Sequence, residues 1–199
     1  MGYTKFDILK IETNNTMLLW KDVYGIASNA SAKKLYKAML EWQTELTNTL
    51  EIWINKGLTM TTGELILARA NLGAVVESWL KLFYCIYYDD YRQNPMRTKK
   101  NKMIQPEKAE FRELNKFSTG ILWDSTDSYE FLWVDSIRDK RNALHSFEYR
   151  NIGTPQDFLD DIDYLYEFVD NILMRLPPIE DCIESYPVGY IHLSPFFKC

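Results

Sequence analysis

The most informative stretch of the sequence covers residues 61–91, which read TTGELILARANLGAVVESWLKLFYCIYYDDY. Its start, Thr61 to Glu64, has the Ser/Thr-x-x-Glu pattern of a capping box, in which two side chains satisfy the free backbone N–H groups of a helix start. Apolar residues then cover most sides of a 3.6-residue helical repeat. Because a helix that is apolar nearly all round is usually buried, this segment is predicted to be the central helix of a bundle.

Apolar residues also recur at helical spacing on both sides of this helix. Gly57 is placed to end one helix, and Pro106, Ser128 and Thr154-Pro155 are placed to begin three others. The sequence therefore predicts an all-α, up-and-down bundle of four main helices plus one short helix. The main helices are predicted at 31–55, 61–91, 128–149 and 155–176, the short helix at 106–117, and the bundle as a whole at about 31–176.

Both ends of the chain are predicted to be irregular arms on a single domain of residues 1–199. Residues 1–28 show no clear helical period and fit short strands or packed loop. Pro177-Pro178 stops the last helix before a C-terminal arm at 179–199. Hydrophobic residues make up 46% of the chain, which is enough for a sizeable core and excludes a disordered protein.

Composition excludes several classes of site. With only two histidines, His145 and His192, no multi-histidine metal site can form, and no cofactor motif is found. The three cysteines have no CxxC spacing, which argues against a zinc knuckle or a disulfide framework. No secretory leader is recognised, and the longest apolar run has seven residues whereas a membrane helix needs about 20. A cytoplasmic protein without membrane contact is therefore expected.

Charge is uneven along the chain, although the net charge is only −5. Residues 154–185 hold nine acidic residues and one basic residue, whereas residues 92–116 hold eight basic and three acidic residues. The basic segment is either a solvated connecting loop or a phosphate-contacting segment in which Lys99, Lys100 and Lys102 help to hold RNA. The net charge argues against indiscriminate nucleic-acid binding, but not against a local RNA cleft.

One group of polar side chains in the helix at 128–149 could carry chemistry. At about 100° per residue, Arg138, Asn142 and His145 fall within about 60° of one another, with Arg141 at the edge of the group. The residues expected on the opposite, core-facing side are Trp133, Ile137, Leu144 and Phe147.

Apolar residues share the outward face with this polar group. A second copy of the same helix across a two-fold axis is a natural way to bury such a mixed face, so a homodimer through this helix is expected. The apolar residues expected there are Phe131, Val134 and Tyr149.

The residue types in the polar group suit phosphodiester chemistry in which the 2′-hydroxyl of RNA is the nucleophile. His145 can act as general acid or base, because histidine exchanges a proton near pH 7. Arg138 or Arg141 can bind the phosphate and stabilise the charge of the transition state, while Asn142 orients them or binds the RNA backbone. No metal is required. The alternative is a surface network of ion pairs among the charged residues of this helix.

The same segment resembles the signature of the HEPN superfamily (higher eukaryote and prokaryote nucleotide-binding domains). The family motif is an arginine, a polar residue and then a histidine, with four to six residues between the arginine and the histidine. Arg138-Asp139 precedes His145 with six intervening residues. Arg141-Asn142 has the more typical Arg-Asn start, but only three intervening residues. As in the family, the motif helix is followed by one long closing helix.

The resemblance implies a metal-independent endoribonuclease, commonly a toxin or an antiviral defence effector. In such enzymes two copies form a composite RNA cleft where their motif helices meet. Phe147 stands where many members have a tyrosine, so a hydroxyl contribution is absent there. Other members have lost catalysis, so the alternative function is an inactive helical module for interaction or for nucleotide or RNA binding. An antitoxin or regulatory protein could be a partner, and a small-molecule-binding bundle is a third class.

Other residues are assigned mainly to packing. Glu77 is expected to pair with Lys81 four residues later, although some HEPN enzymes add an acidic residue from a neighbouring helix. Cys85 is expected to be a buried apolar residue rather than a nucleophile. His192 is expected to pack in the C-terminal arm. The aromatic residues between Trp79 and Tyr91 could stack on bases, but at helical spacing a core role is favoured.

Overall fold

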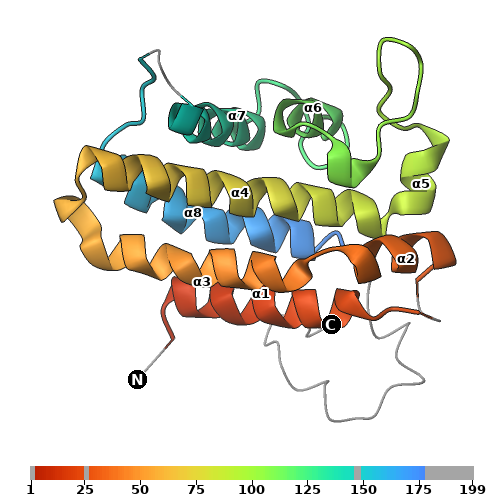
Figure 1. Cartoon of the computed structure of the whole chain (residues 1–199), viewed down its shortest axis with the longest axis horizontal. Coiled ribbons are helices and arrows are strands. Elements are labelled where there is room, and N and C mark those ends of the chain that lie inside the picture. The colour runs from red at the N-terminus through yellow and green to blue at the C-terminus, as the bar shows by residue number, and fades with distance from the viewer. Residues whose placement is uncertain (1–2, 25–26, 146–148, 178–199) are drawn as a thin grey trace.

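The computed structural model describes residues 3–24, 27–145 and 149–177. Over these residues it contains eight α-helices, three short 3₁₀ helices and isolated β-bridges but no strand, so the predicted all-α class is confirmed (Figure 1). The α-helices are α1 Lys5–Lys21, α2 Asn29–Lys37, α3 Leu40–Lys56, α4 Thr62–Ile86, α5 Tyr88–Gln93, α6 Phe111–Phe117, α7 Tyr129–Arg141 and α8 Pro155–Leu173. The 3₁₀ helices are η1 Gly57–Thr59, η2 Pro106–Lys108 and η3 Asn142–His145.

Helix α4 lies at the centre of the fold, as its apolar surface predicts. It packs against α3, α7 and α8, and α1 packs against α3 and α8 on the other side of the core. The predicted capping box is present, because the Thr61 N–H donates to Glu64 Oε2 at 2.9 Å and the Glu64 N–H donates to Thr61 Oγ1 at 3.4 Å. The fully buried apolar residues of α4 include Leu72, Val75, Val76, Trp79 and Leu80.

The N-terminal segment is a helix, so the prediction of an irregular arm at residues 1–28 was wrong. Helix α1 begins at a capping box of Thr4 and Asp7 and runs to Lys21. Its buried positions recur every three or four residues, but half of them are polar. Periodicity of apolar residues alone therefore missed this helix. The buried residues are Leu9, Glu12, Thr13, Thr16, Met17 and Trp20.

Three of the five predicted helices are interrupted. The segment 31–55 divides at Ala38, whose extended backbone (φ −71°, ψ 146°) ends α2 before α3 begins. The segment 61–91 divides at Tyr87 into α4 and α5, and 106–117 divides into η2 and α6. None of these breaks falls on a glycine or proline, so the local sequence gives no signal for them. At Gly57 (φ 52°) the predicted end of α3 is confirmed.

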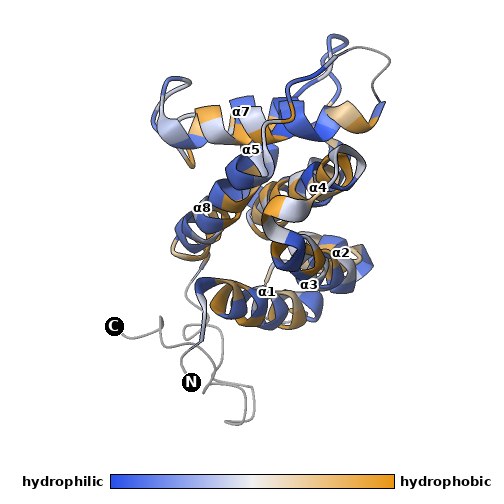
Figure 2. Cartoon of the chain, turned by 90° about the vertical axis from the view of Figure 1, so that its left-hand side faces the viewer, coloured by the Kyte–Doolittle hydropathy of each residue, from blue (hydrophilic) through white to orange (hydrophobic). Residues whose placement is uncertain are grey.

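The two helices that carry the candidate site begin at the predicted caps. Ser128 Oγ accepts the Phe131 N–H at the start of α7, and Thr154 and Asp157 form a capping box at the start of α8, with Pro155 in its first turn. The long helices α1, α3, α4 and α8 run lengthwise, whereas α7 crosses over α4 (Figures 1 and 2). The finer prediction of an up-and-down arrangement of four main helices is therefore not confirmed.

Helix α7 ends earlier than predicted. Its α-helical geometry stops at Arg141, and Asn142 to His145 continue as the 3₁₀ helix η3, so the prediction of a helix to residue 149 was wrong. Phe147 and the predicted C-terminal arm at 179–199, with His192, lie outside the described residues. Across the part of the chain that is described, none of the helices is both long and apolar enough to cross a membrane.

Candidate functional site

The end of α7 lies against the middle of α4, and a glycine makes this close approach feasible. A Cβ atom at Gly73 would lie 2.6 Å from Arg141 Cβ and 2.8 Å from Arg141 Cγ. Such distances are far below ordinary carbon contacts of about 3.5–4.0 Å. The stem of Arg141 therefore rests directly on the backbone of α4 at Gly73.

The Arg141 guanidinium is held by Glu77, one helical turn after Gly73. Arg141 Nη2 lies 3.1 Å from Glu77 Oε2, and Lys81 Nζ lies 2.7 Å from Glu77 Oε1. The predicted Glu77–Lys81 pair is therefore present, and the same carboxylate also meets the motif helix. The cluster contains two cations and one anion. The Arg141 side chain is 37% exposed, which leaves part of its guanidinium accessible to a ligand.

Arg138 has a different environment, because its guanidinium is shared by two carboxylates of its own helix. Its Nη1 lies 2.8 Å from Asp135 Oδ1, and its Nη2 lies 2.6 Å from Asp139 Oδ1. The side chain is only 14% exposed. This cluster contains one cation and two anions, as the alternative of an ion-pair network predicts. A phosphate would have to displace both carboxylates to bind there.

Asn142 and His145 lie on η3 rather than on the α-helix. Asn142 is half-buried at the C-terminal cap of α7, and His145 is exposed. A 3₁₀ helix has about 3.0 residues per turn, so the assumed rotation of about 100° per residue does not hold beyond Arg141. Because side chains at positions i and i+3 eclipse in a 3₁₀ helix, the backbone places Asn142 and His145 on one side of η3.

The helical wheel placed the apolar neighbours of the motif only partly correctly. Trp133 and Ile137 are in the core, as predicted. Val134, predicted to face outward, is fully buried, and Leu144, predicted to face the core, is 51% exposed. Tyr149 is 93% exposed, as the outward prediction requires. Among the residues that the structure describes, Leu144 and Tyr149 are the exposed apolar residues nearest to His145 in the chain.

The three candidate RNA-binding lysines lie on an ordered basic hairpin, residues 97–103. Its two arms meet in an isolated β-bridge between Arg97 and Met103, and the Thr98 N–H donates to Lys102 O at 2.8 Å. Lys99, Lys100 and Lys102 are exposed. Figure 1 shows the hairpin at the α5 end of α4, away from the end of α7, so the structure does not bring these lysines next to His145.

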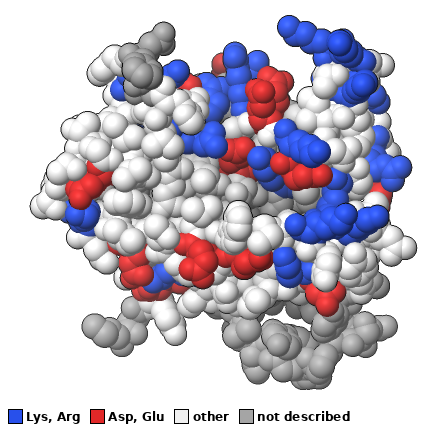
Figure 3. All heavy atoms as spheres, viewed as in Figure 1, with Lys and Arg blue, Asp and Glu red and all other residues white. Residues whose placement is uncertain are grey.

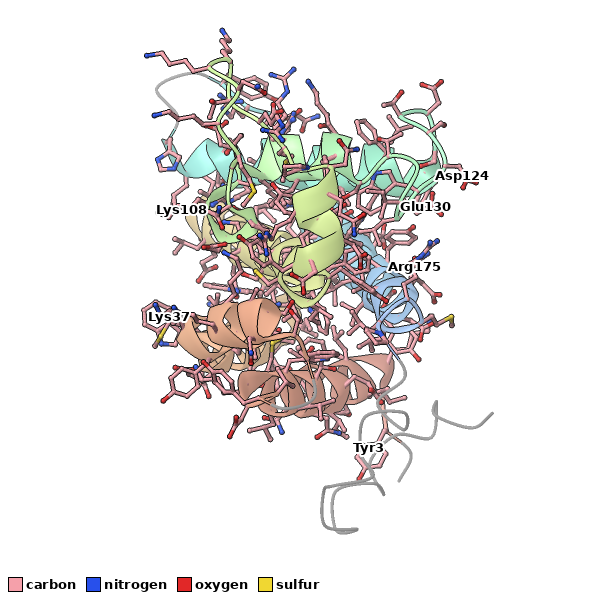
Figure 4. All side chains as sticks on the ribbon, turned by 90° about the vertical axis from the view of Figure 1, so that its right-hand side faces the viewer. Tyr3, Lys37, Lys108, Asp124, Glu130 and Arg175 are labelled. Atoms are coloured by element: carbon pink, nitrogen blue, oxygen red, sulfur yellow. The ribbon has the colours of Figure 1, made fainter. Side chains whose placement is uncertain are left out.

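Lysine and arginine side chains gather over this hairpin in the space-filling view (Figure 3). In Figure 4, Lys108 of the same basic segment and Glu130 at the start of α7 lie on opposite sides of the molecule. The predicted local basic surface thus exists although the whole chain has a net charge of −5.

A buried ion pair that was not predicted from the sequence lies next to the site and is formed by Arg69 of α4 and Asp161 of α8. The Arg69 side chain is 1% exposed, and that of Asp161 is 11% exposed. Burial lowers the pKa of the Arg69 guanidinium, and the negative charge of Asp161 counters this effect. A signal was available, because each residue interrupts a strongly apolar helical stripe.

The remaining candidates lie in the core or elsewhere. Cys85 is buried, as predicted, and burial raises the pKa of its thiol to about 12, which disfavours the reactive thiolate form. Trp79, Tyr84 and Tyr91 are buried and cannot stack on bases. The described residues contain no cluster of His, Cys, Asp and Glu side chains able to hold a metal ion. Two surface hollows of the described residues, one near Trp42 and one near Tyr87, include no motif residue.

Comparison of the chain with protein-family models, with curated proteins and with solved structures finds no match in any of the three.

Proposed function

We propose that this chain is a HEPN-type, metal-independent endoribonuclease that acts as a homodimer. The observation that carries the proposal is the environment of Arg141: a partly exposed guanidinium, held by Glu77 from the neighbouring helix, directly before the turn that bears Asn142 and His145. This favours Arg141 over Arg138 as the motif arginine. In this view α3, α4, α7 and α8 correspond to the four-helix core of the family, and α1 is an addition to it.

The proposed reaction is a transesterification at an RNA phosphate. The 2′-oxygen attacks phosphorus while its proton passes to a base, and the bond to the 5′-oxygen breaks as that oxygen receives a proton. The products are a 2′,3′-cyclic phosphate and a 5′-hydroxyl. His145 of each copy supplies one proton-transfer group, so a dimer provides both an acid and a base. Arg141 stabilises the charge on the non-bridging oxygens, and Asn142 orients the phosphate.

A dimer is part of the proposal for two reasons. Neither of the two hollows described above includes a motif residue, and His145 is exposed, so in this proposal a second surface completes the cleft around it. Leu144 and Tyr149 are exposed apolar residues beside that histidine in the chain. A second motif turn packed on them would bury apolar area and bring two His145 side chains to one cleft.

The experiment compares RNA cleavage by the wild-type chain and three variants in excess chelator. His145→Ala should lower the rate about 10²–10⁴-fold and Arg141→Ala about 10²–10³-fold. Arg138→Ala is the matched control and should change the rate little, because two carboxylates already occupy Arg138. Cyclic-phosphate ends on the products identify the mechanism. Equal cleavage by wild type and His145→Ala would refute His145 as the catalytic group.

The alternative function is an inactive HEPN-like module that binds RNA, and the basic hairpin favours it. The exposed Lys99, Lys100 and Lys102 form no ion pair within the described part of the chain, so they are available to phosphates. Replacing all three with glutamine should weaken RNA binding and reduce the salt slope of the binding constant by about 2. Replacing Lys5, Lys10 and Lys21 of α1 is the charge-matched control. Binding that is lost with the hairpin lysines, without any cleavage by wild type, would support this alternative.

The biological setting belongs to the same proposal. As a HEPN-type ribonuclease, the protein would act in the cytoplasm as a toxin or an antiviral defence effector, and an antitoxin or regulatory protein would restrain it. Purification of the tagged chain from its native cells, followed by mass spectrometry of bound proteins and RNA, tests this setting.

A further inference from the structure

We propose that Asp161, Arg69 and Lys140 form a clamp that fixes the turn bearing Asn142 and His145, and that they are positioning residues for His145. The functional part of this inference rests on the proposed ribonuclease activity, whereas its structural part does not.

The clamp is centred on one buried carboxylate. Asp161 of α8 accepts hydrogen bonds from Arg69 Nη1 of α4, from Lys140 Nζ of α7 at 2.9 Å and from Trp133 Nε1 of α7 at 2.9 Å. Donors from two helices therefore converge on a side chain of a third. Because a buried carboxylate requires such partners, the three helices are fixed relative to one another at this point.

The clamp holds the chain on both sides of the motif turn. Lys140 directly precedes Arg141, so its bond to Asp161 fixes the last turn of α7 just before η3 begins. Arg69 Nε donates to the backbone carbonyl of Ile152 at 3.0 Å, which fixes the chain where it returns to α8. The carboxylate that binds Lys140 also binds Arg69, so both ends of the connection that carries His145 depend on the side chain of Asp161.

The returning chain is fitted closely to Arg69. Gly153 has a φ of 70°, which favours glycine, and a Cβ atom there would lie 3.2 Å from Arg69 Nη2 and 2.9 Å from Asp157 Oδ2. Thr154 then starts α8 with its capping box to Asp157. Backbone conformation and a close approach thus fix Gly153, and a helix cap fixes Thr154 directly after it.

The consequence concerns the preorganisation of His145. This residue is exposed at the end of a four-residue 3₁₀ helix, and short 3₁₀ segments have weaker hydrogen-bond geometry than α-helices. A general acid or base must nevertheless be held in position for proton transfer. The clamp supplies this rigidity from outside the turn, and η3 itself packs mainly on α4 and the end of α7.

Lys140→Met is the variant that tests the clamp. Lys140 is partly exposed, and its removal leaves the buried Arg69–Asp161 pair intact, so the fold should persist. Asp161→Asn would release both ends but would leave two cations without their carboxylate, and it could fail to fold. Lys140→Arg should preserve the contact. Lys10→Gln, which removes a lysine that joins α1 to Glu51 of α3, is the matched control.

Hydrogen exchange followed by mass spectrometry gives a readout independent of catalysis. In Lys140→Met, the backbone amides of residues 142–145 should exchange about tenfold faster than in wild type, while α4 and α8 keep their protection. Lys140→Arg and Lys10→Gln should match wild type at these amides. An unchanged rate at residues 142–145, or an equal increase throughout α7 and α8, would overturn the clamp.

Kinetics test the positioning role separately. In Lys140→Met, kcat for RNA cleavage should fall with KM nearly unchanged, and Lys140→Arg should restore it. In a His192→Ala background His145 is the only histidine, so its imidazole Cε1–H resonance should shift in Lys140→Met. If exchange changes as expected but wild type cleaves no RNA, the clamp stands and only the ribonuclease proposal fails. A changed exchange rate with unaltered kcat would refute the positioning role.

Discussion

Replacement of Gly73 by alanine is expected to destabilise the fold, although alanine is the better helix former. The added Cβ atom would lie 2.6, 2.8 and 2.9 Å from Cβ, Cγ and Cδ of Arg141. Cγ and Cδ can move with a change of rotamer, but Arg141 Cβ is fixed to the backbone of α7. Relief of the contact therefore requires α7 to move away from α4.

The magnitude follows from two opposed effects. Overpacking of a tight contact costs about 1–3 kcal/mol, whereas alanine in place of glycine inside a helix contributes up to about 1 kcal/mol. The expected net loss is about 1–2 kcal/mol in the free energy of unfolding. For a chain of this size, that loss lowers Tm by about 2–8 °C.

Urea denaturation of Gly73→Ala measures this loss, and Gly63→Ala is the matched control. Gly63 lies on the same helix and has open space where a Cβ would be placed, so its replacement should be neutral or slightly stabilising. The contact also predicts that the cost of Gly73→Ala falls when Arg141 is replaced by glycine, which removes the opposing Cβ. If Gly73→Ala is as stable as Gly63→Ala, the close packing of α7 on α4 is wrong.

Three further predictions concern single contacts. Thr154→Ala should lower the free energy of unfolding by about 1 kcal/mol, or Tm by about 2–4 °C, because it removes the cap of α8. Thr154→Ser should retain most of this stabilisation, because serine keeps the hydroxyl group. Lys56 and the Thr61 backbone hold the pKa of Glu64 at about 2, below its usual 4.5. The difference in stability between wild type and Glu64→Gln should therefore be fully present above pH 4.5 and disappear as the pH falls towards 2. Measuring Tm against pH for both proteins tests this prediction. Cys85 should react with a thiol reagent only after unfolding, in a variant whose other two cysteines are serines, and rapid reaction of the native protein would contradict its burial.

Local rules predicted the features of the fold that depend only on neighbouring residues. Three helices are capped where the sequence indicated: α4 by Thr61 with Glu64, α7 by Ser128 and α8 by Thr154. A cap requires only a side-chain oxygen near the start of its own helix, so neighbouring residues suffice to predict it. The end of α3 at Gly57 follows from the same kind of reasoning. The apolar surface of α4 likewise indicated its central position.

Features that depend on distant residues could not be predicted in this way. Helix α1 was missed because Glu12, Thr13 and Thr16 occupy buried positions, and their burial depends on the helices packed around them. The divisions at Ala38 and Tyr87 occur without glycine or proline, so packing rather than local preference determines them. A helical wheel also placed Val134 and Leu144 on the wrong sides, because it does not show which neighbouring elements cover each side chain.

The choice between the two arginines shows how distant residues determine a site. By helical angle Arg138 lay closer to His145 than Arg141 did, but angle does not reveal which charges oppose each side chain. Arg138 meets Asp135 and Asp139 of its own helix, so an approaching phosphate would face two carboxylates and one cation. Arg141 meets Glu77, which is already shared with a lysine, so the same phosphate would face a net positive charge. Attraction of a phosphate to Arg141 thus depends on α4, more than 60 residues earlier in the chain.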